Sequence, residues 1–131
     1  MYEYKVKRLV EVIDGDTVDI EIDLGFDVSI TQRLRLQGID APESRTKDLK
    51  EKVLGLKAKD WLDTQLKQPN LVVKTIKPDS TEKYGRMLGV IYVLGSNESI
   101  NDKMIKEGYA WSYDGGTKHK DLELLIQKQK Q

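Results

Sequence analysis

The chain has 131 residues, no cysteine and a single histidine, and its 22 basic and 22 acidic side chains give a net charge of +0 at pH 7. This composition excludes disulfide frameworks, zinc ribbons and thiol nucleophiles, so any chemistry must use carboxylates, Arg, Lys, Tyr and hydroxyl groups. The chain is as long as one domain, and no apolar run in it is long enough to cross a bilayer.

Alternating apolar residues predict a series of strands in the first third of the chain. The pattern covers residues 4–12, 18–22 and 28–36, with turns at 14–16 and 25–27. The later elements follow in order: a helix over 54–66, strands over 71–77 and 87–94, a short helix over 100–105 and a last helix after Asp121. Short antiparallel strands, with one helix after the third strand and two near the end, predict a small closed OB-type barrel of the α+β, mainly β class.

The acidic side chains of the first strands gather around the turn Asp14-Gly15-Asp16. A glycine permits a tight turn that could aim both carboxylates at one point. An EF-hand is excluded, because Val18 occupies the third ligand position of that motif. The turn is therefore either a cation site of another kind or an ordinary solvated acidic turn.

Two arginines alternate with leucines in Arg33-Leu34-Arg35-Leu36. Because neighbouring strand residues point to opposite faces, both arginines face away from the leucines. Residues 38–42 interrupt the strand pattern and place Asp40 and Glu43 on a loop. The arginines could form ion pairs with these carboxylates, or they could clamp a phosphate, whose oxygens match a guanidinium fork.

Two later segments carry further candidates. Residues 82–86 form either a polar turn with a solvated Arg86 or a second arginine that clamps a phosphodiester from the other side. The aromatic rings of residues 110–113 could stack on a base. The alternative, which we prefer for Trp111, is that they pack in the core beneath a loop.

Three motifs in this order resemble the staphylococcal nuclease (thermonuclease) family: IDGDT at 13–17, RLRLQGIDAPE at 33–43 and KYGR at 83–86. The resemblance extends from about Tyr4 to about residue 126, so we expect one domain over residues 1–131. It implies a five-stranded OB barrel with three helices. It also implies calcium-dependent hydrolysis of phosphodiester bonds in DNA and RNA, which leaves 3′-phosphate ends.

The resemblance also implies a metal site. The carboxylates of Asp16 and Asp40 and the backbone carbonyl of Ala41 would bind Ca²⁺, Glu43 would reach the metal through water, and Asp14 would lie beside it. These are oxygen ligands, which calcium prefers. Glu43 is the only sensible base in a site without histidine, and it either abstracts a proton from water or only orders the water.

The remaining implied residues contact the substrate. Arg35 and Arg86 would hold the scissile phosphate, Lys83 and Tyr84 the neighbouring phosphate, and Tyr113 would flank the base. The two arginines would offset the charge that develops on the phosphoryl oxygens. We expect a monomer that prefers single-stranded DNA and RNA, without membrane contact, in the cytoplasm unless a leader has been removed.

Two alternatives to an active nuclease remain. Domains of this family in multidomain regulators bind nucleic acid or proteins after losing catalytic side chains, whereas this sequence keeps them. A calcium-buffering protein would need only the acidic cluster and would leave both arginines unexplained. One departure from the family lies outside the site: the segment between Thr17 and Arg33 is longer than in its best-known member, and residues 23–26 indicate an extended hairpin.

Overall fold

The computed structural model describes residues 2–75, 87–116, 118 and 120–131. The strands, in chain order, are β1 (Tyr2–Asp14), β2 (Thr17–Gly25), β3 (Val28–Leu36), β4 (Ile39–Asp40), β5 (Leu71–Thr75), β6 (Met87–Val93) and β7 (Trp111–Ser112). The helices are α1 (Leu49–Gln65), α2 (Ile100–Glu107) and α3 (Leu122–Gln129). None of the helices among these residues is long and apolar enough to span a membrane.

Five strands close a barrel in the order β1-β2-β3-β6-β5, and β5 returns to pair with β1. This arrangement confirms the predicted five-stranded OB-type barrel with three helices. One pairing differs from the antiparallel pattern expected from the sequence, because β3 runs parallel to β6. Parallel neighbours need a long crossover, and the chain between Leu36 and Met87, which includes α1 and β5, supplies it.

The core fills the barrel and continues beneath α1. Residues of β2 alternate between buried and partly exposed, and Val18 and Ile20 are completely buried. Ala58 and Leu62 of α1 are equally buried against the barrel. Helix α1 begins five residues before the predicted start, because the Asp48 side chain caps it by accepting two backbone N–H groups, a signal separate from apolar periodicity.

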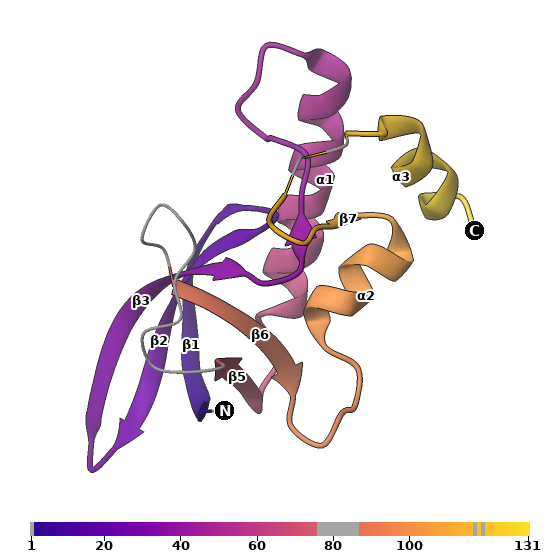
Figure 1. Cartoon of the computed structure of the whole chain (residues 1–131). Coiled ribbons are helices and arrows are strands. Elements are labelled where there is room, and N and C mark those ends of the chain that lie inside the picture. The colour runs from indigo at the N-terminus through magenta and orange to yellow at the C-terminus, as the bar shows by residue number, and fades with distance from the viewer. Residues whose placement is uncertain (1, 76–86, 117, 119) are drawn as a thin grey trace.

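Two very short strands that the sequence did not predict connect the barrel to the C-terminal segment (Figure 1). Ile39 and Asp40 of β4 pair with Ser112 and Trp111 of β7. This pairing is too short to leave a periodic pattern, since it involves two residues on each side. The pairing brings the segment that follows Trp111 next to Asp40.

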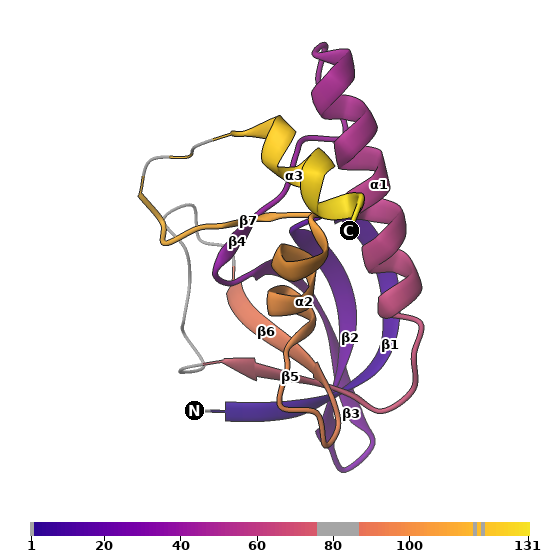
Figure 2. The same ribbon diagram turned by 90° about the vertical axis from the view of Figure 1, so that its right-hand side faces the viewer.

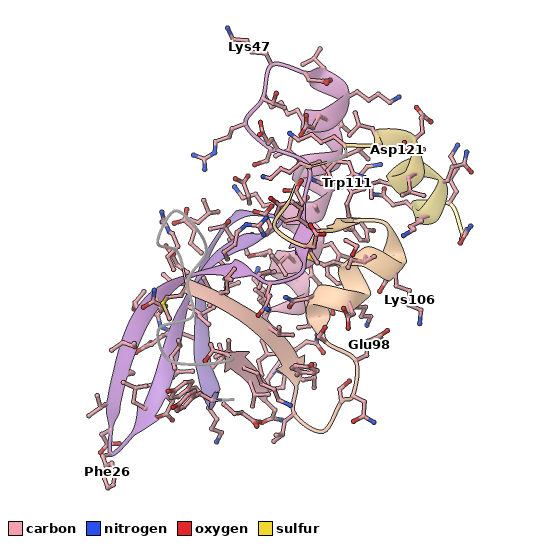
Figure 3. The ribbon with its side chains drawn as sticks, in the orientation of Figure 1. Phe26, Lys47, Glu98, Lys106, Trp111 and Asp121 are labelled. Atoms are coloured by element: carbon pink, nitrogen blue, oxygen red, sulfur yellow. The ribbon has the colours of Figure 1, made fainter. Side chains whose placement is uncertain are left out.

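Helix α3 and the β2–β3 hairpin lie at opposite ends of the molecule. In both Figure 1 and Figure 2, α3 and most of α1 lie above the hairpin, whose tip points downward. The hairpin extends beyond the barrel, as the sequence between Thr17 and Arg33 indicated. Figure 3 labels Phe26 at its tip, where the ring points away from every other element.

Candidate functional site

Arg35 is buried, and two carboxylates share its guanidinium group. Its Nη2 atom lies 3.6 Å from Oδ2 of Asp16 and 3.6 Å from Oδ1 of Asp40. The strand register explains the first contact, because Thr17 of β2 pairs with Arg35 of β3 and Asp16 immediately precedes Thr17. The two carboxylates offset part of the cost of removing a guanidinium from water.

Asp16 also joins the first turn to the loop after β4. Its Oδ2 accepts the N–H of Ala41 at 3.0 Å, and its Oδ1 accepts the hydroxyl of Thr17 at 3.0 Å. Gly15 lets this turn lie against the helix, since a Cβ atom there would come within 2.8 Å of the Cβ atoms of both Ala41 and Ala58. The glycine is therefore required by close packing, and its φ angle is not in the positive range that a strained turn would need.

Asp40 is the most buried carboxylate of the group, with 4% of its surface exposed. Burial raises the pKa of Asp40 above its ordinary value, and the neighbouring charge of Asp16 acts in the same direction. Lys118, whose Nζ lies 3.3 Å from Oδ1 of Asp40, and Arg35 oppose this shift. Asp40 therefore faces two cations and one anion in a partly desolvated position.

Glu43 lies at the open side of the site, and its side chain is 61% exposed. Helix α1 holds its backbone: the N–H of Glu43 donates to Oε2 of Glu51 at 3.0 Å. Lys120 donates to the same oxygen of Glu51 at 3.0 Å and lies 3.4 Å from Oε1 of Glu43. The Glu43 carboxylate is thus exposed to solvent beside Lys120, while its backbone is fixed.

A narrow cleft of about 170 Å³ connects these groups. It is lined by Asp14, Asp16, Thr17, Arg35, Asp40, Ala41, Pro42, Glu43, Lys118 and Lys120. Asp14 is part of this lining, and its carboxylate accepts a hydrogen bond from the hydroxyl of Ser44. The described structure therefore brings the predicted residues Asp14, Asp16, Arg35, Asp40, Ala41 and Glu43 to one place.

A larger hollow of about 410 Å³ adjoins the cleft at Asp40 and Lys118, and Tyr113 lines it. The Tyr113 hydroxyl donates to the carbonyl of Gly116 at 2.8 Å, and Lys118 lies 5.7 Å from the centre of the tyrosine ring. Trp111 is different, because it is only 6% exposed and donates its indole N–H to the carbonyl of Asp121. Trp111 is a core residue that anchors the start of α3, as preferred from the sequence (Figure 3).

The donor set of the cleft fits calcium. Asp16 and Asp40 face the same guanidinium nitrogen, and the carbonyl of Ala41 belongs to a residue of the same lining. All are oxygen atoms of the kind that calcium prefers, and water can supply further oxygen ligands. Among the described residues, no three His, Cys, Asp or Glu side chains are close enough together to hold a metal ion, so such a site would have two protein carboxylates at most in direct contact.

Three predicted residues, Lys83, Tyr84 and Arg86, lie outside the described residues. Conversely, the structure places Lys118, Lys120 and Glu51 at the site, and the sequence analysis did not identify them. The lysines belong to a segment without periodicity, and their partners are more than 60 residues away. One sequence feature could have indicated the contact near Glu51: Gly55 is a glycine within a helix, which often marks a place where the helix lies close to another part of the chain.

Comparison with known proteins assigns most of the chain to one family. The family model described as staphylococcal nuclease homologue matches residues 33–131. An uncharacterized protein of Methanocaldococcus jannaschii is 30% identical over 98% of this chain and 69% of its own length. The thermonuclease of Staphylococcus hyicus is 29% identical over 95% of this chain and 69% of its own length. Endonuclease YhcR of Bacillus subtilis is 31% identical over 86% of this chain, which corresponds to 9% of that much longer protein.

Proposed function

The chain belongs to the family of staphylococcal nuclease homologues, and we propose that it is a calcium-dependent nuclease that hydrolyses phosphodiester bonds of DNA and RNA and leaves 3′-phosphate ends. The observation that carries the proposal is the meeting of Asp16 and Asp40 at the buried guanidinium of Arg35. A cleft that combines two carboxylates with a guanidinium can hold a cation and a phosphate side by side. Phosphodiester hydrolysis requires this combination, because negative charge grows on the phosphoryl oxygens.

Five residues of the cleft have a part in this proposal. The carboxylates of Asp16 and Asp40 and the carbonyl of Ala41 would hold Ca²⁺, which when bound polarises a phosphoryl oxygen. Arg35 donates N–H groups to the scissile phosphate and offsets its charge. Glu43, exposed at the mouth of the cleft, accepts a proton from the attacking water or orders that water, and it would reach the metal only through water.

The proposed substrate contacts extend from this centre in two directions. Tyr113, which lines the adjoining hollow, would flank the base next to the scissile phosphate. Arg86 would hold the scissile phosphate together with Arg35, while Lys83 and Tyr84 would contact the neighbouring phosphate. We propose a preference for single strands, because a base must leave a duplex stack before it can enter the hollow. All of these residues come from one chain, so the catalytic unit needs one copy.

Incubation of the pure protein with single-stranded DNA, RNA and duplex plasmid tests the proposal. We expect cleavage with Ca²⁺, no cleavage with excess chelator, and 3′-phosphate ends that a phosphatase can remove. Mg²⁺ should support less cleavage, because it demands a tighter octahedral site. Asp40→Asn should abolish cleavage, whereas Asp60→Asn, which changes an exposed carboxylate on α1, is the control. Full activity in excess chelator would contradict the role of calcium.

A second candidate function is a nucleic-acid or protein-binding module with little catalysis. The observation that favours it is the pairing of Asp40 with Lys118 and of Glu43 with Lys120, which leaves both carboxylates engaged. Such a module would bind labelled oligonucleotides with equal affinity in Ca²⁺ and in chelator, and the oligonucleotides would stay intact. The same incubation, analysed by gel for cleavage and by anisotropy for binding, distinguishes the two functions.

A further inference from the structure

The β2–β3 hairpin carries an apolar surface that the proposed nuclease activity does not use. Leu24, Phe26, Val28 and Ile30 are 42%, 101%, 52% and 44% exposed. Val28 and Ile30 share a sheet face with Leu34, which is buried in the barrel. The core-facing side of β3 therefore continues past the barrel as an uncovered apolar face at the tip that Figure 3 labels with Phe26.

The turn at the tip holds an aromatic residue in a backbone conformation that disfavours it. Phe26 has φ of 54° and Asp27 has φ of 60°, both in the left-handed region. Gly or Asn would adopt this conformation more easily, and a bulky residue there is an outlier. Among the residues that the structure describes, the ring gains no contact that could offset this cost, because Phe26 is fully exposed. A contact with another molecule is the simplest compensation.

The edge of the same hairpin is open to a further strand. Residues 28–33 pair with β2 on one side, whereas on the other side β3 meets β6 only from Leu34 to Leu36. Within the described part of the chain, the outer edge of 28–33 has no strand partner. Proteins usually protect such an edge with Lys, Pro or a bulge. The sequence VSITQR at 28–33 contains neither Lys nor Pro, and its register with β2 is regular from Ser29 to Arg33, with one irregularity opposite Val28, between Asp23 and Gly25.

We propose that this hairpin is a self-association surface, on which two copies of the chain pair their β3 strands antiparallel about a two-fold axis at Ile30. The edge then gains backbone hydrogen bonds that the described residues do not give it, and opposite residues lie on the same sheet face. The apolar faces of the two hairpins become continuous, and each Phe26 approaches the point at which β6 begins to pair with Leu34 of the other copy. The residues pair across the interface as follows: Ile30 with Ile30, Ser29 with Thr31, and Val28 with Gln32.

Charge complementarity supports a second copy as the partner. In this register Asp27 of one chain lies at the level of Arg33 of the other, and the symmetry repeats the pair. Arg33 already binds Asp19 of its own chain, through Nε at 2.8 Å and Nη2 at 3.0 Å. A guanidinium has five N–H donors, so donors remain for a second carboxylate. Asp27 is exposed at the tip, where its carboxylate can reach an N–H donor of Arg33 in the other copy.

The charges of the hairpin are unfavourable for other partners. Four carboxylates on it would repel the phosphates of a nucleic acid or an anionic lipid surface: Asp19, Glu21, Asp23 and Asp27. Two of the nearby cations are already paired with these carboxylates, since Arg8 binds Glu21 at 2.7 Å and Arg33 binds Asp19. An apolar, self-complementary edge between these charges fits a second copy better.

Sedimentation equilibrium over a concentration series up to about 1 mM tests the association, which we expect to be weak because an edge contact buries little area. The wild type should show a monomer–dimer equilibrium. Ile30→Lys, which would place two like charges together at the axis, should remain monomeric with a native circular dichroism spectrum. Phe26→Asn should weaken the dimer although it relaxes the turn. Leu56→Lys, which changes an apolar residue of α1 with nearly the same exposure as Ile30, should dimerise like the wild type.

The absence of cysteine from the chain allows the register to be tested directly. Opposite residues in an antiparallel pair lie about 4.5–5.5 Å apart at Cα, which suits a disulfide. Under mild oxidation Ile30→Cys should form a covalent dimer. Ser29→Cys and Thr31→Cys should each remain monomeric alone, whereas their mixture should form a mixed disulfide.

Three results would overturn the proposal. The first is a wild type that stays monomeric at about 1 mM, and the second is a Ser29→Cys variant that cross-links as readily as Ile30→Cys. The third is a monomeric wild type that binds lipid vesicles or oligonucleotides and loses this binding with Phe26→Asn. That result would assign the hairpin to a different partner. None of these measurements uses nuclease activity, so the proposal is tested independently of the proposed function.

Discussion

The backbone of Glu43 lies directly against Gly55 of α1, and a Cβ atom at Gly55 would come within 2.3 Å of the Glu43 carbonyl oxygen. Gly55 does not have a positive φ, so its value to the fold is the space it leaves. One turn earlier, Glu51 accepts the N–H of Glu43 at 3.0 Å. Helix α1 therefore sets the position of the proposed catalytic carboxylate from both sides of its peptide backbone.

Replacing Gly55 with Ala should destabilise the protein. In a solvated helix this change stabilises by about 0.5–1 kcal/mol, because alanine loses less entropy than glycine on folding. Here the methyl group meets backbone atoms that cannot move away without shifting the loop, and overpacking of this kind costs about 1–3 kcal/mol. Urea denaturation measures the difference, with Lys57→Ala on the exposed face of α1 as a control. A Gly55→Ala protein more stable than the wild type would show that the loop yields freely.

Asn101→Ala should destabilise the protein by about 1–3 kcal/mol, the cost of leaving buried polar groups unpaired. The side chain of Asn101 is buried and accepts the N–H of Ile91 at 3.2 Å. Its amide group donates to the carbonyls of Gln37 at 2.8 Å and Gly89 at 3.2 Å. It thereby links α2 to β6 and to the turn before Asp40. Thermal denaturation of Asn101→Ala and of Asp102→Ala, an exposed neighbour, compares the two positions; equal melting temperatures would contradict the assignment.

The barrel and about half of the site could be predicted from the sequence, for identifiable physical reasons. Alternation of apolar residues in β2 determines which side is buried, and the strand register then places Arg35 beside Asp16. The parallel pairing of β3 with β6 has no local signature, because it depends on a crossover of about fifty residues. The positions of Lys118 and Lys120 at the site could not be predicted either, since the sequence of a loop does not show which carboxylates the fold will bring to its lysines.

The ion pair between Asp19 and Arg33 should make the hairpin sensitive to acid. The hydrogen bond from Arg33 holds the pKa of Asp19 below its ordinary value, so protons bind the unfolded chain more readily. The resulting stability is present above the unfolded pKa of 3.8 and is lost as the pH falls through the lower folded value. Because the pair lies near the surface, we expect it to contribute less than about 1 kcal/mol to the free energy of unfolding.

Asp19→Asn should therefore lower the melting temperature slightly at pH 7, and its difference from the wild type should shrink as the pH falls below 3.8. Melting curves from pH 7 to pH 2 measure this difference, provided that both proteins still fold at the lowest pH. The control is Asp60→Asn, a change of an exposed carboxylate on α1. A constant difference between wild type and Asp19→Asn across the whole range would exclude a titrating pair.

Arg35→Lys should reduce turnover while the fold remains native. Lysine keeps the positive charge but lacks the planar fork that matches a phosphate and two carboxylates. We expect a loss of about 2.7–4 kcal/mol in transition-state stabilisation, as for other deleted donors to a developing oxyanion. Single-turnover kinetics on a short oligonucleotide separates this effect from binding. Arg33→Lys, which changes the arginine that binds Asp19, is the matched control, and similar losses for both variants would deny Arg35 a special role.

Asp16→Asn should remove the stabilisation that Ca²⁺ gives to the folded chain. If Asp16 is a ligand, Ca²⁺ at a hundred times its dissociation constant should stabilise the wild type by about 2.7 kcal/mol. Asp14→Asn is the informative control, because its side-chain carbonyl can still accept the Ser44 hydroxyl and we place Asp14 only beside the metal. Thermal melting with and without Ca²⁺ measures both variants without reference to activity. A full calcium response in Asp16→Asn, together with a lost response in Asp14→Asn, would move the metal site to the other carboxylate of the turn.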